Sequence, residues 1–235
     1  GGLDLIKVPT TLIAQVDAAI GGKCSINLPE GKNMAGTYYQ PKAIIIDPGF
    51  ARTLPDPILA DGMAEIIKTA CVCDPDLYSD LLARADMRNA AGLESIIYRC
   101  CLIKKQALEQ DSRDKGAALL LNFGHTLGHA IENCYPDGRF RHGHAVAIGM
   151  HAITSSSERL GLTAEGTADK VKKILLAYDL DYAMTKELTK EQLVKAAEHD
   201  KKHHGEILDL VILSRIGEAR IHTIPYEDLY EFIPD

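Results

Sequence analysis

The sequence lacks the features that define membrane and nucleic-acid binding proteins. Its longest apolar runs, Ala43–Ile46 and Ile207–Leu213, are shorter than the roughly 20 residues that span a bilayer, so no membrane partner is expected. Nucleic-acid binders concentrate positive charge on one surface. Here the 26 basic residues are scattered and outnumbered by 33 acidic ones, which gives a formal charge of -7. Nucleic acid is therefore not an expected partner.

The chain also lacks a disulfide framework, internal repeats and low-complexity segments. Its six cysteines form no CxxC pair, and a chain of 235 residues needs no disulfides to remain folded, so free thiols and a cytoplasmic location are expected. A composition of 46% hydrophobic and 25% charged residues is typical of a soluble globular protein and excludes disorder. No signal-like segment precedes Leu3, and residue 1 is Gly, so we expect a chain whose beginning is missing.

Two kinds of local pattern divide the chain near Leu54. Before it, Leu3–Val8 and Lys42–Asp47 are short apolar runs bounded by proline, which predicts buried strands. Between these runs, Gly21–Gly36 has no helical period and predicts a loop that approaches a ligand. After Leu54, apolar residues recur at every third or fourth position, which predicts helices.

The predicted helices cover most of the second part of the chain. They are expected at Asp56–Ala70, Asp76–Ala85, Leu93–Glu109, Ala117–Asn133, Ala145–Leu160, Thr167–Tyr178, Glu191–His199 and Tyr226–Ile233. A late β-hairpin is predicted from Leu208–Leu213 and Ala219–Ile224, with Gly217 in its turn. The sequence thus predicts an α/β remnant over residues 1–54, followed by a predominantly α-helical domain over residues 55–235 with a small late β-hairpin.

The strongest chemical signal is the segment NFGHTLGHAIE, which runs from Asn122 to Glu132. At about 100° per residue, Asn122, His125, His129 and Glu132 share one helix face, and the opposite side is apolar. Two histidines at i and i+4 either bind one divalent ion or divide into a ligand and a proton carrier. A solvated helix face explains the same pattern about equally well.

A third ligand for such an ion is available from a separate part of the chain. His142 follows His125 by seventeen residues and precedes the next predicted helix. Three protein ligands on zinc leave one position open for substrate. In the helix after Pro57, Glu65 shares a face with Asp61 and Lys68, so Glu65 is either the carboxylate ligand of this site or part of an exposed face with an ion pair.

Two clusters of glycine and lysine favour phosphate binding. The first is Gly21–Lys23, near Asp17, and the second is Gly31–Asn33. Glycines let backbone amides approach a phosphate, and a lysine adds positive charge. Neither cluster is a Walker A loop, because the GxxxxGK[ST] spacing is missing.

Taken together, these segments resemble the 3-dehydroquinate synthases, the cyclases of the shikimate pathway. The matching segments span nearly the whole chain in the family's order. They are Val8–Leu12, Ala14–Asp17, Gly21–Lys23, Gly31–Met34, Tyr39–Lys42, Gly62–Lys68, Leu121–Glu132, His142–Gly143, Ala145–Met150 and Asp200–Lys202.

The resemblance implies a set of roles for residues of this chain. In the family, an amino-terminal Rossmann-like domain binds NAD and a helical domain carries the metal and substrate groups. The zinc ligands would be Glu65, His125 and His142, and cobalt accepts the same ligands. The NAD side would include Thr10, Thr11, Lys23, Lys32, Phe50, Ala51, Arg52 and Thr53. The residues that hold or act on substrate would be Asp17, Lys23, Asn33, Lys68, Lys104, Asn122, His129, Lys201 and Lys202.

The implied reaction converts a seven-carbon keto-acid phosphate, 3-deoxy-D-arabino-heptulosonate 7-phosphate, into 3-dehydroquinate and inorganic phosphate. The enzyme would be a phosphate lyase and a homodimer in its intact form. The family's glycine-rich NAD loop lies upstream of this chain, so the isolated chain is expected to be inactive. Two residues depart from the family pattern: Ala118 replaces an Arg that helps hold the substrate carboxylate, and His144 replaces a Glu.

These departures leave two alternatives open. One is another sugar-phosphate cyclase, whose substrate has no carboxylate; Ala118 favours it and Lys104 opposes it. The other is a non-catalytic helical module stabilised by zinc.

Overall fold

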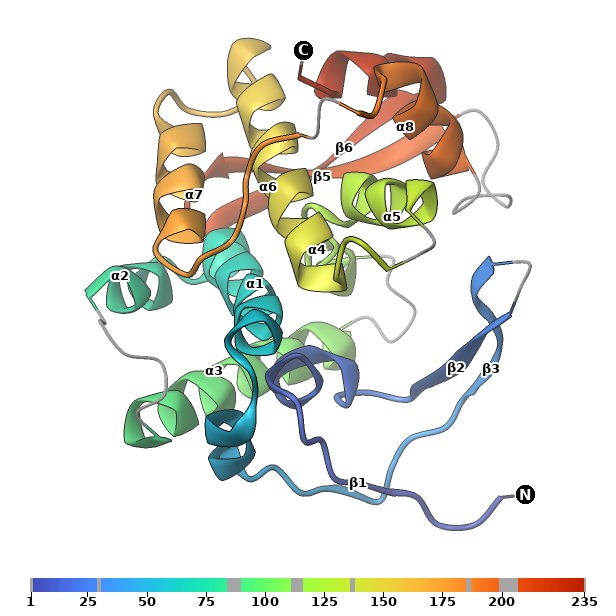
Figure 1. Cartoon of the computed structure of the whole chain (residues 1–235), viewed down its shortest axis with the longest axis vertical. Coiled ribbons are helices and arrows are strands. Elements are labelled where there is room, and N and C mark those ends of the chain that lie inside the picture. The colour runs from blue at the N-terminus through green and yellow to red at the C-terminus, as the bar shows by residue number, and fades with distance from the viewer. Residues whose placement is uncertain are drawn as a thin grey trace.

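The computed structural model describes residues 2–28, 31–83, 90–110, 116–135, 138–184, 187–198 and 207–234. Figure 1 shows helices gathered around α1, with the amino-terminal strands on one side and a late hairpin on the other. None of the described helices is long and apolar enough to cross a membrane. The predicted fold class is confirmed: a small α/β remnant precedes a mainly helical part with a late antiparallel hairpin.

The amino-terminal part contains a parallel strand pair and an antiparallel hairpin. Strand β1 (Ile6–Lys7) pairs in parallel with β4 (Ala43–Ile44). The connection between them includes the π-helix η1 (Ala14–Ala18) and the antiparallel strands β2 (Lys23–Leu28) and β3 (Gly31–Tyr38). A crossover between parallel strands is the feature that gives this remnant its α/β character.

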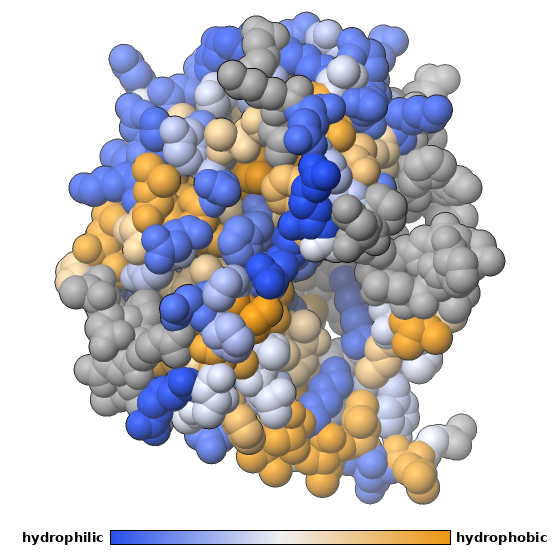
Figure 2. Space-filling view, in the orientation of Figure 1, coloured by the Kyte–Doolittle hydropathy of each residue, from blue (hydrophilic) through white to orange (hydrophobic). Residues whose placement is uncertain are grey.

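Two predictions for this part were wrong. The two predicted strands are not buried: Ile6 of β1 is 58% exposed, and Ile45, directly after β4, is 57% exposed, because nothing in the described structure covers these side chains. Figure 2 shows the resulting apolar surface along the lower edge of the molecule. The stretch Gly21–Gly36 is not a loop but most of the β2–β3 hairpin, in which Lys23 pairs with Tyr38. Cross-strand pairing between these two neighbouring strands, rather than the β-propensity of their residues, forms the hairpin.

The second part begins after the 3-10 helix η2 (Pro48–Thr53). Its helices are α1 (Asp56–Cys73), α2 (Pro75–Ala83), α3 (Ala90–Gln110), α4 (Ala117–Leu120), α5 (His125–Cys134), α6 (His142–Arg159), α7 (Thr167–Leu176) and α8 (Lys190–Glu198). The strands β5 (Ile207–Arg215) and β6 (Glu218–Pro225) form the late antiparallel hairpin. The last described element, η4 (Tyr226–Phe232), is a 3-10 helix.

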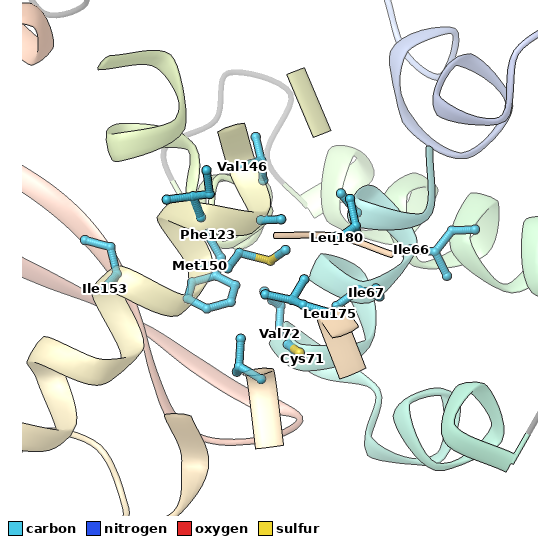
Figure 3. Close-up of a cluster of buried hydrophobic side chains, with 14 of the residues drawn as sticks. Ile66, Ile67, Cys71, Val72, Phe123, Val146, Met150, Ile153, Leu175 and Leu180 are labelled. Carbon is cyan, nitrogen blue, oxygen red and sulfur yellow. The ribbon is translucent and has the colours of Figure 1, made fainter. Parts of the chain in front are cut away.

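Helix α1 lies at the centre of the core. Every residue from Leu59 to Val72 is buried, so the exposed-face interpretation of this helix is wrong. Figure 3 shows Ile67 and Val72 of α1 beside Met150 of α6 and Leu175 of α7. A helix surrounded on all sides buries its polar residues together with its apolar ones. Each buried polar group then needs a partner inside the protein.

The helix predicted over Ala117–Asn133 is interrupted. Helix α4 ends at Leu120, and α5 begins only at His125. Gly124 between them adopts a left-handed conformation with a φ of 78°, and a Cβ atom there would lie 2.5 Å from Met150 Cγ. The close approach of α6 therefore requires glycine at this break. A single glycine inside a helical period does not by itself predict such a break.

Small residues bring α5 and α6 into direct contact. A Cβ atom on Gly149 of α6 would lie 2.2 Å from the carbonyl oxygen of Gly124. A Cβ atom on Gly128 of α5 would lie 3.0 Å from Val146 Cα. These contacts fix the spacing of the two helices that carry His125 and His142.

We predict that Gly149→Ala lowers the free energy of unfolding by about 3 kcal/mol, because the added methyl group meets backbone atoms that cannot rotate away. The matched control is Gly161→Ala. Gly161 has a φ of 72° but open space around it, so only the left-handed backbone is penalised, by about 1 kcal/mol. Urea unfolding measures both variants. Equal losses would contradict the proposed helix contact.

Candidate metal and substrate site

Three elements bring one carboxylate and two imidazoles together. Glu65 comes from the middle of α1, and His125 and His142 are the first residues of α5 and α6. Glu65 Oε1 lies 3.6 Å from His125 Nε2 and 3.3 Å from His142 Nε2. All three donor atoms lie within 4.8 Å of one another. This is the spacing of groups that can share one metal ion.

The donor set fits a divalent metal ion. Glu65 is 1% exposed, and its Oε1 atom is buried without a hydrogen bond from any described residue. A buried carboxylate oxygen without a donor is costly unless a cation satisfies it. One carboxylate and two imidazoles are ligands that zinc accepts, and they leave a position open for substrate.

Contacts behind the ligands orient them. The Phe123 carbonyl oxygen lies 3.2 Å from His125 Nδ1; since a carbonyl only accepts, Nδ1 donates and Nε2 faces Glu65. Asp61, one turn before Glu65, accepts a hydrogen bond of 2.6 Å from the backbone N–H of Gly143. That bond ties α1 to the start of α6, where His142 lies.

A chain of alternating charges leads away from Glu65. The Lys68 ammonium group contacts the second oxygen of Glu65 and lies 3.1 Å from Asp17 Oδ2. The Lys104 ammonium group contacts Asp17 Oδ1 and donates a hydrogen bond of 2.7 Å to the Asp17 carbonyl oxygen. Lys68 is 3% exposed, so this network connects the protein interior to the residues of η1 and α3.

The surrounding charges set the protonation states of the three donors. Burial alone would raise the pKa of Glu65, but Lys68 and then His125 hold that pKa well below its ordinary value. Burial, together with Lys68, lowers the pKa of His125 to about 3. Burial opposes the charged form of His142, yet the contacts of its ring with the Glu132 and Glu65 carboxylates raise its pKa to about 9. An ionised Glu65 and a neutral His125 are the forms that bind metals.

A cavity of about 310 Å³ opens beside two of the three donors, His125 and His142. Several of the residues predicted for the site line it: Asp17, Lys23, Lys68, Lys104, Asn122, His125 and His142. Ala118 also lines the cavity and is 5% exposed. The His129 ring lies beside the site, with its centroid 5.4 Å from that of His125 and 5.8 Å from that of His142.

The remaining predicted residues lie elsewhere or outside the described structure. Thr10 is exposed, and Thr11 accepts a hydrogen bond from the Ala14 backbone at the start of η1. Phe50, Ala51, Arg52 and Thr53 form most of η2, and Ala51 is buried at 1% exposure. The side chains of Lys32 and Asn33 and all of Lys201 and Lys202 lie outside the described part of the chain.

Sequence reasoning missed some residues that line the cavity. Tyr38 and Gln40 line it because the β2–β3 pairing places the end of β3 beside Lys23. No local pattern indicates this, since β3 does not read as a strand from its glycines and asparagine. Ile13, Leu108 and Leu121 add an apolar wall, and their periodicity predicts only burial.

The chain is similar to solved cyclases. One is 2-epi-5-epi-valiolone synthase from Streptomyces hygroscopicus subsp. jinggangensis, solved with NAD+ and Zn2+ bound, with a TM-score of 0.85 and 26% identity over 97% of this chain and 65% of that one. Another is 2-deoxy-scyllo-inosose synthase complexed with carbaglucose-6-phosphate, NAD+ and Co2+, with a TM-score of 0.84 and 26% identity over 98% of this chain and 66% of that one. The fold of the chain is therefore that of the sugar-phosphate cyclases.

The family itself follows from the sequence comparisons. Residues 62–203 match the family model described as 3-dehydroquinate synthase C-terminal, and residues 1–61 match the N-terminal one. The chain is 42% identical to a 3-dehydroquinate synthase of Clostridium acetobutylicum over 99% of this chain and 65% of that one. It is also 42% identical to one from Lactococcus lactis subsp. cremoris, over 99% and 66% of the two chains. The chain belongs to the 3-dehydroquinate synthase family and spans about 65% of these relatives' length.

We predict that Lys68→Met lowers the free energy of unfolding by about 3 kcal/mol, because it leaves the Glu65 and Asp17 carboxylates without their shared cation. Lys105→Met is the control: its partner is Glu109, and the two side chains are 63% and 62% exposed. That exposed pair should contribute less than about 0.5 kcal/mol. Chemical denaturation of both variants measures the difference. Similar losses would contradict a structural role for the buried network.

Proposed function

We propose that this chain supplies the metal- and substrate-binding part of a 3-dehydroquinate synthase. The enzyme would use NAD and zinc to convert 3-deoxy-D-arabino-heptulosonate 7-phosphate into 3-dehydroquinate with release of phosphate, in the shikimate pathway of aromatic amino acid biosynthesis. The observation that carries the proposal is the trio of the buried Glu65 with His125 and His142, beside a lysine-lined cavity. The 42% identity to relatives named for this activity supports it.

Glu65, His125 and His142 would hold the zinc ion, with cobalt as an alternative. When bound, the metal would polarise a substrate hydroxyl group, and NAD would serve as hydride acceptor and donor. Lys68 contributes by keeping Glu65 ionised, as the lowered pKa of that carboxyl indicates. The residues proposed for the NAD side are Thr10, Thr11, Lys23, Lys32, Phe50, Ala51, Arg52 and Thr53.

The charges that line the cavity suit a substrate with a phosphate and a carboxylate. Lys23, Lys68 and Lys104 line it with three ammonium groups, and the carboxylates of Asp17 and Glu65 pair with two of these, Lys68 and Lys104, so one net positive charge remains. Such groups orient an anionic substrate and stabilise the phosphate as it departs. Asn122 lines the cavity and would offer an amide to substrate hydroxyls. His129, whose ring centroid lies 5.4 Å from that of His125, is proposed to exchange protons with bound substrate. Asn33, Lys201 and Lys202 are proposed to complete the substrate site.

A second candidate is a cyclase for a sugar phosphate without a carboxylate. Ala118 favours it, because this cavity wall carries a methyl group instead of a guanidinium that would pair with a carboxylate. The solved complex with carbaglucose-6-phosphate shows that a protein of this fold can bind such a ligand. We favour the keto acid, because Lys104 lines the cavity and identity to the 3-dehydroquinate synthases is higher. A non-catalytic, zinc-stabilised module is the remaining alternative.

We predict one zinc ion per chain in the purified protein, measured by elemental analysis. His142→Ala should abolish it, because the substitution removes one of the three donors. The control is His151→Ala on the same helix, where the ring packs against Tyr182 at 4.9 Å between centroids and away from the trio. His151→Ala should keep its zinc. A folded wild-type chain without zinc, or zinc retained by His142→Ala, would contradict the assignment.

We predict that a protein containing this chain together with the family's amino-terminal NAD-binding part releases phosphate from 3-deoxy-D-arabino-heptulosonate 7-phosphate, and not from glucose 6-phosphate or sedoheptulose 7-phosphate. Ala118→Arg should lower the KM for the keto acid about tenfold, since a new carboxylate partner adds about 1.4 kcal/mol of binding. Ala117→Arg is the control, because Ala117 does not line the cavity.

The outcomes separate the three candidates. Turnover of glucose 6-phosphate or sedoheptulose 7-phosphate alone would favour the carboxylate-free cyclase. Zinc binding without turnover of any substrate would favour the non-catalytic module. From the family resemblance we also propose that the protein is a homodimer and that it is cytoplasmic. Light scattering of the same preparation measures the molar mass and so tests for the homodimer.

A further inference from the structure

Glu132 is a buried carboxylate that the proposed chemistry does not use. It lies on α5 two turns after His125, and it is 9% exposed. Its Oε2 atom lies 3.2 Å from Nδ1 of His142. Burying a carboxylate costs free energy unless a partner compensates it, so the contact of Glu132 with His142 needs an explanation.

His142 contacts a different carboxylate through each of its ring nitrogens. Nε2 lies 3.3 Å from Glu65 Oε1, and Nδ1 lies 3.2 Å from Glu132 Oε2. A carboxylate accepts hydrogen bonds and does not donate them, so Nδ1 carries the proton that faces Glu132. Nε2 also faces a carboxylate, but it lies on the side of Glu65 and His125, so it is the nitrogen that would give up its proton to a metal ion shared by the three donors. An imidazole that donates its other N–H to a carboxylate is a common arrangement at zinc sites.

Glu132 could instead be a ligand, because donor atoms of His129, Glu132 and His142 also lie within 4.8 Å of one another. A single ion cannot contact both ring nitrogens of His142, which point in opposite directions. A second ion on Nδ1 would require His142 to lose both ring protons. If Glu132 instead accepts a hydrogen bond from Nδ1–H, His142 loses only its Nε2 proton when one metal ion binds. We therefore favour the hydrogen bond over a second metal ion.

The spacing of α5 and α6 makes this contact possible. Glu132 and His142 lie on different helices, and Gly128 of α5 allows Val146 of α6 to approach closely. On the backbone side, Asp61 of α1 accepts a hydrogen bond from the N–H group of Gly143, the residue after His142. His142 is thus restrained both through its ring and through the backbone that follows it.

We propose that Glu132 is a positioning residue. It accepts a hydrogen bond from the Nδ1–H group of His142 and so holds Nε2 toward Glu65 and His125, which raises the affinity of the trio for zinc. The proposal rests on the zinc site described under Proposed function. Glu132 itself does not contact the metal or the substrate.

The test compares Glu132→Ala and Glu132→Gln with the wild-type chain. Glu132→Ala removes the acceptor and should weaken zinc binding about 10- to 100-fold, measured by competition with a chelator. Glu132→Gln keeps an uncharged acceptor, so its zinc affinity should lie between those of the wild type and the alanine variant. The control is Glu158→Gln at the far end of α6, where Glu158 binds the backbone N–H groups of Gly166 and Ala168. That variant should bind zinc like the wild type.

Two spectroscopic measurements separate positioning from a general loss of stability. The visible spectrum of the cobalt-loaded chain should change in Glu132→Ala and be unchanged in Glu158→Gln, because only the former alters a ligand's orientation. In the metal-free chain, the Nδ1–H proton of His142 should give a downfield, slowly exchanging nuclear magnetic resonance signal. Glu132→Ala should lose this signal.

Each other outcome would overturn the proposal. Unchanged zinc affinity in Glu132→Ala would remove the positioning role. Two zinc ions per wild-type chain, falling to one in both Glu132 variants, would make Glu132 a ligand. If the wild-type chain binds no zinc, the proposed function loses its metal site, and the His142 signal in the metal-free chain still decides whether the hydrogen bond exists.

Discussion

The buried ion pair between Glu65 and Lys68 is the interaction on which the site depends. Both side chains lie on α1, a helix that the core surrounds, and neither could remain charged there alone. Lys68 holds one oxygen of Glu65 and connects it to Asp17. The other oxygen remains free of hydrogen bonds from described residues and faces His125 and His142. A structural ion pair thus leaves a negatively charged atom directed at two imidazoles.

Close helix contacts convert this charge into a site. Gly143 lets α6 approach α1 so closely that a Cβ atom on it would lie 2.0 Å from the Asp61 carbonyl oxygen. Gly149 likewise lets α6 approach the start of α5, where a Cβ atom would lie 2.2 Å from the Gly124 carbonyl oxygen. Because the three donors come from these three helices, the donor spacing is set by backbone packing more than by side-chain flexibility. Residues outside the trio, such as Asp61 and Glu132, then restrain its members.

Much of the helical part could be predicted from the sequence. Periodicity located α1, α3, α6 and the late hairpin to within a few residues, because amphipathic elements bury one regular face. Periodicity failed where distant contacts override local preference. The helix break at Gly124 depends on α6, and the β2–β3 hairpin depends on its own cross-strand pairing. The strands β1 and β4 were located but wrongly expected to be buried.

The sequence by itself determined which groups are available for chemistry: the NFGH segment with its two histidines, the later His142, and the carboxylate and ammonium groups of α1. It also determined the family, through motifs in a fixed order. Only the tertiary structure decided which oxygen of Glu65 faces the imidazoles, which nitrogen of His142 faces Glu132, and that Ala118 lines the cavity. The physical reason is that these relations join helices distant in sequence, whose spacing depends on packing and not on local propensity.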